Sequence, residues 1–376
     1  MAMIVLQVLP SLQAGGVEQS TVEITAAITA AGGRAIVASA GGRLVPAIER
    51  AGGRHVTLPL ATKDPFRIWR NAAALADLVR AERVAIVHAR SRAPAWSAWL
   101  AARRTGAHFV TTAHGVYAED LPLKRRYNAV MAMGERVIAN SRHVGDRLAQ
   151  RHGVGPDRLR VIPRGVDPAS FDPDAVDSAR IARLASLWRL PDGAPVLLLP
   201  GRLTRWKGQA LLLDAMARMQ DRRTVAVLAG DAQGRHRYVA SLERQAGALG
   251  LSPRVRLPGH CADMPAAMAA ADLVVNASLL PEPFGRTIIE AQAMRRPVLA
   301  ADHGGAAETI EPGATGWRFP PGDAAALACA LDAALALPAH ARAAVGARAR
   351  AAVCAGYTTA AMQAATIAVY RELLDA

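Results

Sequence analysis

The sequence predicts an α/β protein with two domains, each built from repeated strand–helix units. Three observations support this prediction. At 376 residues the chain is long for a single hydrophobic core, so two domains are the default expectation. Hydrophobic residues make up 52% of it, which excludes a disordered chain. Short apolar runs alternate with alanine-rich helical stretches, and this pattern stops at a linker rich in proline and aspartate and then restarts.

We predict that the first half begins with an apolar strand at 4–9. This interpretation is favoured over a signal peptide because the segment has neither the basic residues nor the cleavage site of one. A loop at 10–16 and a helix from about 17 to 31 follow, and Gly32-Gly33 ends that helix. The same alternation predicts further strands at 35–39, 55–58, 85–89, 109–112, 136–139 and 158–162, with helices between them.

The linker DPASFDPDAVD, 167–177, separates the two halves. Its Asp172 and Asp174 lie between prolines and not at a strand end, so we predict no metal site there. In the second half we expect a helix at 209–219 and an amphipathic last helix at 359–374. Strands are predicted at 195–199, 225–229, 255–259, 272–276 and 297–300.

The segment PEPFGRTIIEAQAM, 281–294, has the features of a ligand-binding turn. Pro281 and Pro283 keep the chain extended, and Gly285 lets it turn before a helix at 286–294. The turn follows the strand 272–276, and open α/β sheets bind ligands at the carboxyl ends of their strands. The start of the helix presents free N–H groups, which suit a phosphate.

Two glutamates of this segment, Glu282 and Glu290, stand eight positions apart. The helical neighbours of Glu290 are Thr287, Ala293 and Met294, a largely apolar stripe. A carboxylate there needs hydrogen-bond donors, and the hydroxyls of a nucleotide ribose would serve. A structural glutamate bonded to backbone N–H groups is the alternative.

A second motif, GRLTRWKG at 201–208, follows the strand 195–199 and opens the helix 209–219. Arg202 and Lys207 place two cations beside a helix N-terminus, an arrangement that suits a diphosphate.

Strand ends of the first half carry further candidates. Gly15-Gly16 lacks the G-x-G-x-x-G spacing of a nicotinamide site but still opens a helix, where glycine permits close approach of a ligand. His114 follows the strand 109–112, and Arg90, Ser91 and Arg92 follow the strand 85–89. Two arginines around a serine would grip an acidic acceptor, with solvated surface arginines as the alternative.

Together these motifs resemble the retaining glycosyltransferases of family 4, which have the GT-B fold. The resemblance covers nearly the whole chain. It includes the family's E-x7-E in 281–294, its G-R-x-x-x-x-K-G in 201–208 and its first-loop glycine pair. VRLPG at 255–259 is similar to the family's strand beside the base pocket, DHGGAAE at 302–308 to its G-G-x-x-E, and TGWRFPPGD at 315–323 to a turn. VIPRGVD at 161–167 has Arg164 where asparagine is usual, so no specific role is predicted for Arg164.

The resemblance implies two Rossmann-like domains that face each other across a cleft: an acceptor-binding domain at 1–168, onto which the helix 359–376 packs back, and a donor-binding domain at 169–358. It also implies transfer of a sugar from a nucleoside-diphosphate sugar, with retention and without a metal or other cofactor. The implied catalytic residues are His114, Arg202, Lys207 and Glu282. The implied donor-binding residues are Gly16, Gly201, Arg202, Lys207, Phe284, Gly285, Arg286 and Glu290, and the acceptor-binding residues are Gly15, Arg90, Ser91 and Arg92.

The net charge of +14 suggests an anionic partner. Nucleic acid is disfavoured, because five Phe and five Tyr offer few stacking platforms and no nucleic-acid motif is present. Anionic membrane or a phosphorylated substrate fits better, although a coding bias towards Ala and Arg explains part of the excess. Basic residues flank aromatic ones at Lys63, Phe66, Arg67, Trp69 and Arg70, at Trp96, Trp99, Arg103 and Arg104, and at Lys124–Tyr127.

Three cysteines without a C-x-x-C pair suggest a reducing compartment, and no apolar run reaches the roughly 18–20 residues of a membrane span. We therefore expect a cytoplasmic enzyme, attached peripherally to the inner face of the plasma membrane, that glycosylates a glycan or a lipid-linked acceptor in lipopolysaccharide or surface-polysaccharide synthesis. The alternatives are a GT-B sugar-nucleotide 2-epimerase, for which an epimerised product is the test, and a basic nucleic-acid-binding protein. The latter would bind DNA in a salt-sensitive way without affinity for UDP or GDP.

Overall fold

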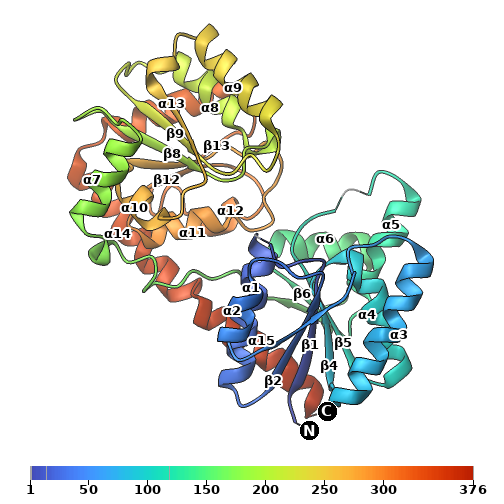
Figure 1. Cartoon of the computed structure of the whole chain (residues 1–376). Coiled ribbons are helices and arrows are strands. Elements are labelled where there is room, and N and C mark those ends of the chain that lie inside the picture. The colour runs from blue at the N-terminus through green and yellow to red at the C-terminus, as the bar shows by residue number, and fades with distance from the viewer. Residues whose placement is uncertain (1, 14, 118, 376) are drawn as a thin grey trace. The chain divides into compact units, whose positions relative to one another are not determined.

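The computed structural model describes residues 2–13, 15–117 and 119–375 and consists of two compact units (Figure 1). Unit 1 comprises Met1–Arg164 and Thr359–Ala376, and unit 2 comprises Gly165–Thr358. The boundary between the two units therefore follows Arg164, earlier in the chain than the boundary after residue 168 that the sequence predicts. The reason is that Val166 forms a β-bridge with Thr358 and donates its N–H to the carbonyl of Tyr357, which ties the start of the linker to unit 2.

Unit 1 contains a seven-stranded, wholly parallel sheet in the order β3-β2-β1-β4-β5-β6-β7. The central strands are buried on both faces, which explains their nearly continuous apolar runs. All seven predicted strands are confirmed. They are β1 (Ile4–Val8), β2 (Arg34–Ser39), β3 (Arg54–Thr57), β4 (Ile86–Ala89), β5 (His108–Ala113), β6 (Arg136–Ala139) and β7 (Leu159–Val161).

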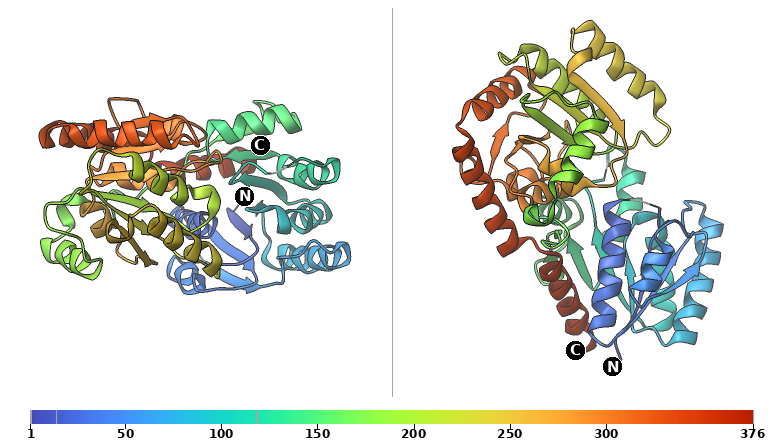
Figure 2. Two further views of the ribbon diagram at one scale, coloured as in Figure 1. Left: turned by 90° about the horizontal axis from the view of Figure 1, so that it is seen from above. Right: turned by 60° about the vertical axis from the view of Figure 1, so that its left-hand side comes forward.

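Helices cover both faces of this sheet. One face is covered by α1 (Gly16–Ala30), α2 (Val45–Arg50) and α15 (Thr359–Leu374), and α15 packs beside α1 (Figures 1 and 2). The bounds of α15 are those predicted, because its apolar residues Met362, Ile367 and Tyr370 complete the core of this face. The other helical segments are α3 (Pro65–Glu82), α4 (Arg92–Thr105), α5 (Pro122–Asn128), η1 (Ala129–Ala132) and α6 (Arg142–His152), of which α3, α4 and α6 pack on the opposite face.

Unit 2 contains a six-stranded parallel sheet in the order β10-β9-β8-β11-β12-β13. Five strands were predicted. The sixth, β13, lies in the middle of the segment 315–323 that was predicted as a turn; Thr315 and Pro321–Gly322 at its two ends do form turns, but the strand between them was not predicted. Trp317–Phe319 pairs with Leu299–Ala301 at the edge of the sheet, and three residues are too few to show a strand period. The strands are β8 (Val196–Pro200), β9 (Val225–Ala229), β10 (Val255–Gly259), β11 (Leu273–Asn276), β12 (Val298–Ala301) and β13 (Trp317–Phe319).

The helices of unit 2 again form two layers. On one face lie α8 (Gln209–Arg218), α9 (His236–Ala248) and α13 (Ala324–Ala336). On the other lie α7 (Ser178–Leu187), α10 (Met264–Ala269), α11 (Arg286–Ala293) and α12 (Ala306–Thr309), and α14 (Ala339–Gly356) packs on α11. Short 3₁₀ turns occur at η2 (Pro173–Ala175), η3 (Arg205–Lys207) and η4 (Ser252–Arg254).

Both sheets reverse their winding direction at one point, between β1 and β4 in unit 1 and between β8 and β11 in unit 2. The connections on either side of such a point run to opposite faces, which leaves a crevice at the carboxyl ends of the two strands. Gly15-Gly16 and Arg90 to Arg92 follow the two strands at this point in unit 1, and the segments 201–208 and 281–294 follow the two strands at the point in unit 2. Within the described residues no single helix meets the length and hydropathy of a membrane span, although α13 and α14 pass together as a sharply bent pair.

Candidate functional site

The loop Gly201–Gly208 leaves β8 at the switch point of unit 2 and is held against the exit of β11. Gly208 has φ 73°, and a Cβ there would stand 1.8 Å from the carbonyl oxygen of Ala277. The N–H of Leu279 donates to the carbonyl of Trp206 at 2.7 Å from the opposite side. Only glycine permits this approach of two backbones, and the fixed loop then presents Arg202 and Lys207.

Lys207 and Glu282 form an ion pair across this junction. The ammonium of Lys207 donates to Oε1 of Glu282, and the same oxygen accepts from Ser278 Oγ at 2.6 Å and Asn276 Nδ2 at 3.2 Å. The two charged side chains are only 14% and 9% exposed. Burial disfavours the carboxylate, but the charge of Lys207 and the three hydrogen bonds outweigh it and lower the pKa of Glu282. Two motifs far apart in sequence thus become one charged site.

The segment after β12 holds the backbone of Glu282 in place. The N–H of Gly305 donates to the Glu282 carbonyl at 2.7 Å, and a Cβ on Gly304 would lie 2.3 Å from that oxygen. His303 Nε2 donates to the carbonyl of Ser278 at 2.8 Å. The glycines of DHGGAAE therefore allow close packing behind the turn that carries Glu282.

Arg202 has a different environment from Lys207. Its side chain is exposed, while its carbonyl accepts from Gln209 Nε2 at 3.0 Å, and Gln209 Oε1 accepts from Tyr238 Oη at 3.1 Å. The backbone of Arg202 is therefore anchored while its guanidinium faces solvent. The structure brings Gly201, Arg202 and Lys207 together on one loop.

At the start of α11, Gly285 adopts φ 83° and precedes the first helical residue, Arg286. Arg286 Nε donates to Glu290 Oε1 at 3.4 Å, and the two side chains are 24% and 15% exposed. Phe284 packs in an apolar cluster with Ile289, and its ring centroid lies 5.8 Å from that of Tyr357. The Phe284 side chain thus packs in the core of unit 2 beside the predicted donor-binding turn.

In unit 1, Gly15 precedes α1 with φ 147° and Gly16 is the first helical residue. The pair follows β1 at the switch point, and no side chain of the described residues caps this helix end. A Cβ on Gly15 would lie 2.6 Å from Glu18 Oε2, so glycine is needed where this carboxylate approaches the backbone at the helix start.

Arg90 does not lie on the surface. It is 2% exposed, and its guanidinium donates to Gln7 Oε1 at 3.1 Å and Ser20 Oγ at 2.6 Å. Burial lowers the pKa of Arg90 to about 10 against the raising effects of Tyr370 and Glu23, so the side chain stays charged at neutral pH. The alternative of a solvated surface arginine was wrong. Because two of its nitrogens already bond within unit 1, Arg90 holds this unit together.

Ser91 and Arg92 open α4. Ser91 occupies the N-cap without a side-chain capping bond. Arg92 Nη1 donates to Asn128 Oδ1 at 2.9 Å, and its guanidinium carbon lies 3.9 Å from the ring centroid of Tyr117. The structure therefore separates the predicted acceptor triplet into a buried arginine, a helix cap and an arginine stacked on a tyrosine.

His114 follows β5, as predicted, and meets a residue to which the sequence assigned no role. Arg164 Nη2 donates to His114 Nδ1. Burial, together with the charges of Arg164 and Arg90 and the neighbouring His88, holds the pKa of His114 well below its usual value, so the ring is neutral. Arg164 is 6% exposed. A single arginine that follows a strand, as Arg164 does, does not by itself predict a contact with a histidine that follows another strand.

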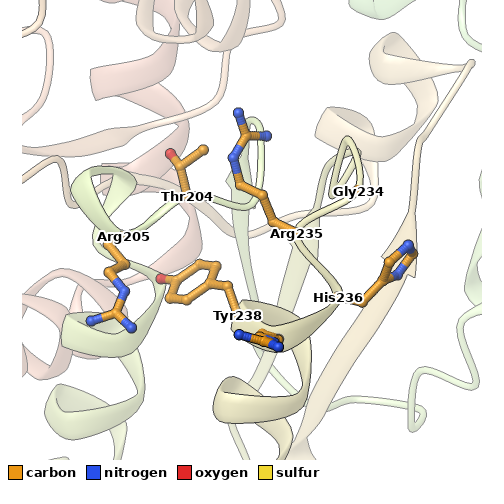
Figure 3. A pocket seen from close by; sticks show the side chains of 7 residues that line it. Thr204, Arg205, Gly234, Arg235, His236 and Tyr238 are labelled. Carbon is orange, nitrogen blue, oxygen red and sulfur yellow. The ribbon is translucent and has the colours of Figure 1, made fainter.

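A cavity of about 690 Å³ borders the donor loop of unit 2 (Figure 3). The loop side contributes Thr204 and Arg205, and the start of α9 contributes the rest, including Tyr238. This cavity was not predicted from the sequence. The basic run GRHR at 234–237, which follows β9, could have indicated it. Its lining residues are Thr204, Arg205, Gly234, Arg235, His236, Arg237 and Tyr238.

Among the described residues, no group of three or more His, Cys, Asp or Glu side chains is placed to hold a metal ion.

Comparisons with known proteins agree with this geometry. Residues 14–170 match the family model described as Glycosyltransferase Family 4, and residues 185–352 match Glycosyl transferases group 1. A glycosyltransferase of Rickettsia africae is 33% identical, with 99% of both chains covered and a TM-score of 0.92. The Anabaena protein HepE in complex with UDP-glucose is 27% identical over 99% of both chains, with a TM-score of 0.86.

A curated relative, the D-inositol 3-phosphate glycosyltransferase of Salinispora tropica, is 32% identical over 296 residues. The match covers 70% of this chain and 61% of that relative. The chain thus spans less than two thirds of the length of this relative. With whole-length similarity to the Rickettsia protein and both family models matched, the chain belongs to the family 4 (group 1) glycosyltransferases, which have the GT-B fold.

Proposed function

We propose that this protein transfers a sugar from a nucleoside-diphosphate sugar to a hydroxyl of a glycan or lipid-linked acceptor, with retention at the anomeric carbon and without a metal ion. The observation that carries the proposal is the Lys207–Glu282 pair at the switch point of unit 2. It joins a cation that suits phosphate to a carboxylate that suits sugar hydroxyls. The exposed side chain of Arg202 lies on the same loop.

In this mechanism the bond between the anomeric carbon and the diphosphate oxygen breaks, and both electrons go to the oxygen. Arg202, Lys207 and the N–H groups at the start of α11 stabilise the negative charge that develops there. Glu282 binds hydroxyls of the donor sugar, and Glu290 binds the ribose. The departing phosphate accepts the proton of the acceptor hydroxyl, which then bonds to the anomeric carbon, so no side chain acts as nucleophile.

The ion pair is compatible with phosphate binding. A lysine ammonium carries three N–H donors, and its hydrogen bond to Glu282 uses one. The ring centroid of Trp206 lies 4.5 Å from the same nitrogen and helps to hold it in place. Glu282 thus orients Lys207 and leaves it donors for a diphosphate.

The donor is tested by measuring hydrolysis and thermal stabilisation with UDP-, GDP- and ADP-sugars. We expect one nucleotide class to raise the melting temperature of the wild type. Arg202→Ala should abolish most of that rise. The control Arg218→Ala should not, because Arg218 is exposed at the end of α8 and donates to the carbonyl of Asp214 in its own helix. Equal stabilisation of both variants would contradict the assignment of the donor loop.

The acceptor is tested in the same assay. The name of the Salinispora relative makes D-inositol 3-phosphate one candidate, and the basic surface of this chain suits such a phosphorylated acceptor. We favour a glycan or lipid-linked acceptor of lipopolysaccharide or surface-polysaccharide assembly. Transfer to the soluble phosphate alone would reject the lipid-linked acceptor, and an epimerised donor without transfer would reject the transferase.

We further propose that unit 1 attaches reversibly to the inner face of the plasma membrane. Phe66 and Trp69 in the first turns of α3 are 71% and 58% exposed, and Leu121 and Leu123 around the start of α5 are 54% and 80% exposed. Exposed basic residues accompany both groups. Trp96 is only partly exposed, and its side chain is held within unit 1, because its Nε1 donates to the carbonyl of Tyr127 and its ring packs on Trp99.

Apolar side chains beside cations suit the headgroup region of an anionic bilayer, where each cation contributes about 1 kcal/mol. Co-sedimentation with vesicles tests this attachment. Binding should require anionic lipid, fade as salt rises, and weaken in Lys124→Ser/Arg125→Ser/Arg126→Ser. Phe66→Ser/Trp69→Ser should weaken it with less change in salt dependence. Equal behaviour towards anionic and neutral vesicles at low salt would contradict the proposal.

A further inference from the structure

A buried polar cluster lies at the carboxyl ends of β4, β5 and β7 in unit 1. His88 in β4 bonds to Tyr370 Oη through Nδ1 at 2.7 Å and to Thr112 Oγ1 through Nε2 at 2.6 Å. Both nitrogens of His88 are therefore satisfied. Burial, with the charges of Arg90 and Arg164, holds the pKa of His88 well below its usual value. This neutral histidine is a structural part of the cluster.

His114, the second histidine, is bonded on one nitrogen only. Arg164 Nη2 donates to its Nδ1. A guanidinium has only donors, so Nδ1 must be the acceptor, and in a neutral ring the proton is then on Nε2. Burial and the charges of Arg164 and Arg90 also keep the ring neutral, because they lower the pKa of His114. The contact thus determines the tautomer of His114.

The Nε2 of His114 is buried and has no hydrogen-bond partner within residues 2–13, 15–117 and 119–375. A buried donor without a partner is costly, and such atoms are rare in folded proteins. The carbonyl of His114 is itself engaged, since it lies 3.4 Å from Asn140 Nδ2. The unmet donor is therefore the feature that points to a ligand.

Arg164 is itself held in place from a second element. It is 6% exposed, and its Nη1 lies 3.8 Å from Met362 Sδ near the start of α15. Arg164 is also the last residue of unit 1 before the chain enters unit 2. Its guanidinium therefore contacts α15 through Nη1 and the imidazole of His114 through Nη2.

We propose that Arg164 is a positioning residue that locks His114 as the neutral Nε2–H tautomer, so that His114 donates one hydrogen bond to a ligand oxygen. The ligand atom is an acceptor: a sugar hydroxyl or carbonyl oxygen, or a phosphate oxygen. This inference rests on the proposed function only for the identity of the ligand. The tautomer itself is a property of unit 1.

The tautomer is measured by long-range ¹H–¹⁵N correlation spectra of the full-length protein with ¹⁵N-labelled histidine, the His114 signals being identified by their loss in His114→Gln. The wild type should show the Nε2–H pattern. Arg164→Lys keeps a donor-only cation and should preserve it. Arg164→Met removes the donor, and Arg164→Asn offers either a donor or an acceptor, so both should give a mixture of tautomers.

Arg158→Met is the matched control. Arg158 also lies in unit 1 and donates to the backbone carbonyls of Ala132 and Gly134, without contact to His114. It should leave the His114 spectrum unchanged. An Nδ1–H pattern in the wild type, or the Nε2–H pattern kept in Arg164→Met and Arg164→Asn, would overturn the inference. Melting curves identify any variant that fails to fold. If Arg164→Met does not fold, Arg164→Asn is measured in its place.

Turnover gives a second readout. Loss of one oriented donor typically lowers a rate by roughly 10²-fold. We expect Arg164→Met to lower kcat, but by less than this full factor, because the part of the population that keeps Nε2–H still donates, and Arg164→Lys to recover most of it. A shifted tautomer with unchanged turnover would overturn the ligand contact of His114. The donor function of unit 2 would be unaffected, since it has its own test at Arg202.

Discussion

Removal of the Lys207 ammonium should destabilise unit 2 because it leaves a buried carboxylate without its counter-charge. We consider Lys207→Met, which keeps the length of the side chain. The partners are 14% and 9% exposed, so the magnitudes of buried ion pairs apply, not the roughly 0–1 kcal/mol of surface pairs. Breaking a buried pair on one side costs about 3–5 kcal/mol. Ser278 and Asn276 still donate to Glu282, which places the expected loss near the lower limit.

A loss of about 3 kcal/mol is a large part of the stability of a domain, and at about 2–4 °C per kcal/mol it lowers the melting temperature by roughly 6–12 °C. Scanning calorimetry measures this shift, and urea unfolding of the single variants and of Lys207→Met/Glu282→Gln completes a double-mutant cycle. We expect the double variant to be more stable than the sum of the single losses predicts, with a coupling of about 2–3 kcal/mol.

Two results would refute this reasoning. The first is a loss of less than about 0.5 kcal/mol in Lys207→Met, the size expected of a solvated surface pair. The second is a pair of single losses that add without coupling, which would mean that the two side chains do not interact in solution. Arg218→Met serves as the control, since it removes an exposed cation from the helix that follows the same loop.

Four further predictions concern the same unit. The pKa of Glu282 is lowered on folding, so its contribution to stability is present above its ordinary pKa of 4.5 and is lost as the pH falls through the folded pKa. The difference in unfolding free energy between wild type and Glu282→Gln should therefore narrow when urea titrations are repeated at acid pH. A difference that stays constant with pH would contradict the lowered pKa. Arg202→Ala should lower turnover by about 10²-fold while the melting temperature stays near that of the wild type, because its side chain is exposed. Glu290→Gln should weaken nucleotide binding in calorimetric titrations without loss of fold; normal affinity with early melting would favour the structural alternative for this glutamate. Gly208→Ala should prevent folding of unit 2 or lower its melting temperature strongly, since the added Cβ would stand 1.8 Å from a carbonyl oxygen at φ 73°.

The sequence alone determined the elements of both units. Strand and helix periods are local properties, which is why the last helix, 359–374, has its predicted bounds and the strands of unit 1 differ from prediction by one residue at most. The edge strand Trp317–Phe319 was missed, because three residues between a glycine and a proline carry no period of their own.

The positions of the two loops of the donor site were also visible in the sequence, because each follows an apolar strand and opens a helix. Their contact was not. Lys207 and Glu282 meet because β8 and β11 are neighbours in the sheet although β9 and β10 lie between them in the chain. Strand order depends on the packing of whole helices on both faces of the sheet, and no local pattern encodes it.

Burial also became known only from the tertiary structure. Arg90 reads in the sequence as one of two arginines around a serine, yet it lies inside unit 1 with Gln7 and Ser20, while Phe284 proves to be a core residue. Arg164 gave no signal, and its contact with His114 exists because the ends of β5 and β7 lie on one sheet edge under α15. Residue type and spacing determined which chemistry this chain carries. The packing of distant segments decided which charges are paired, which are buried and which remain open to a ligand.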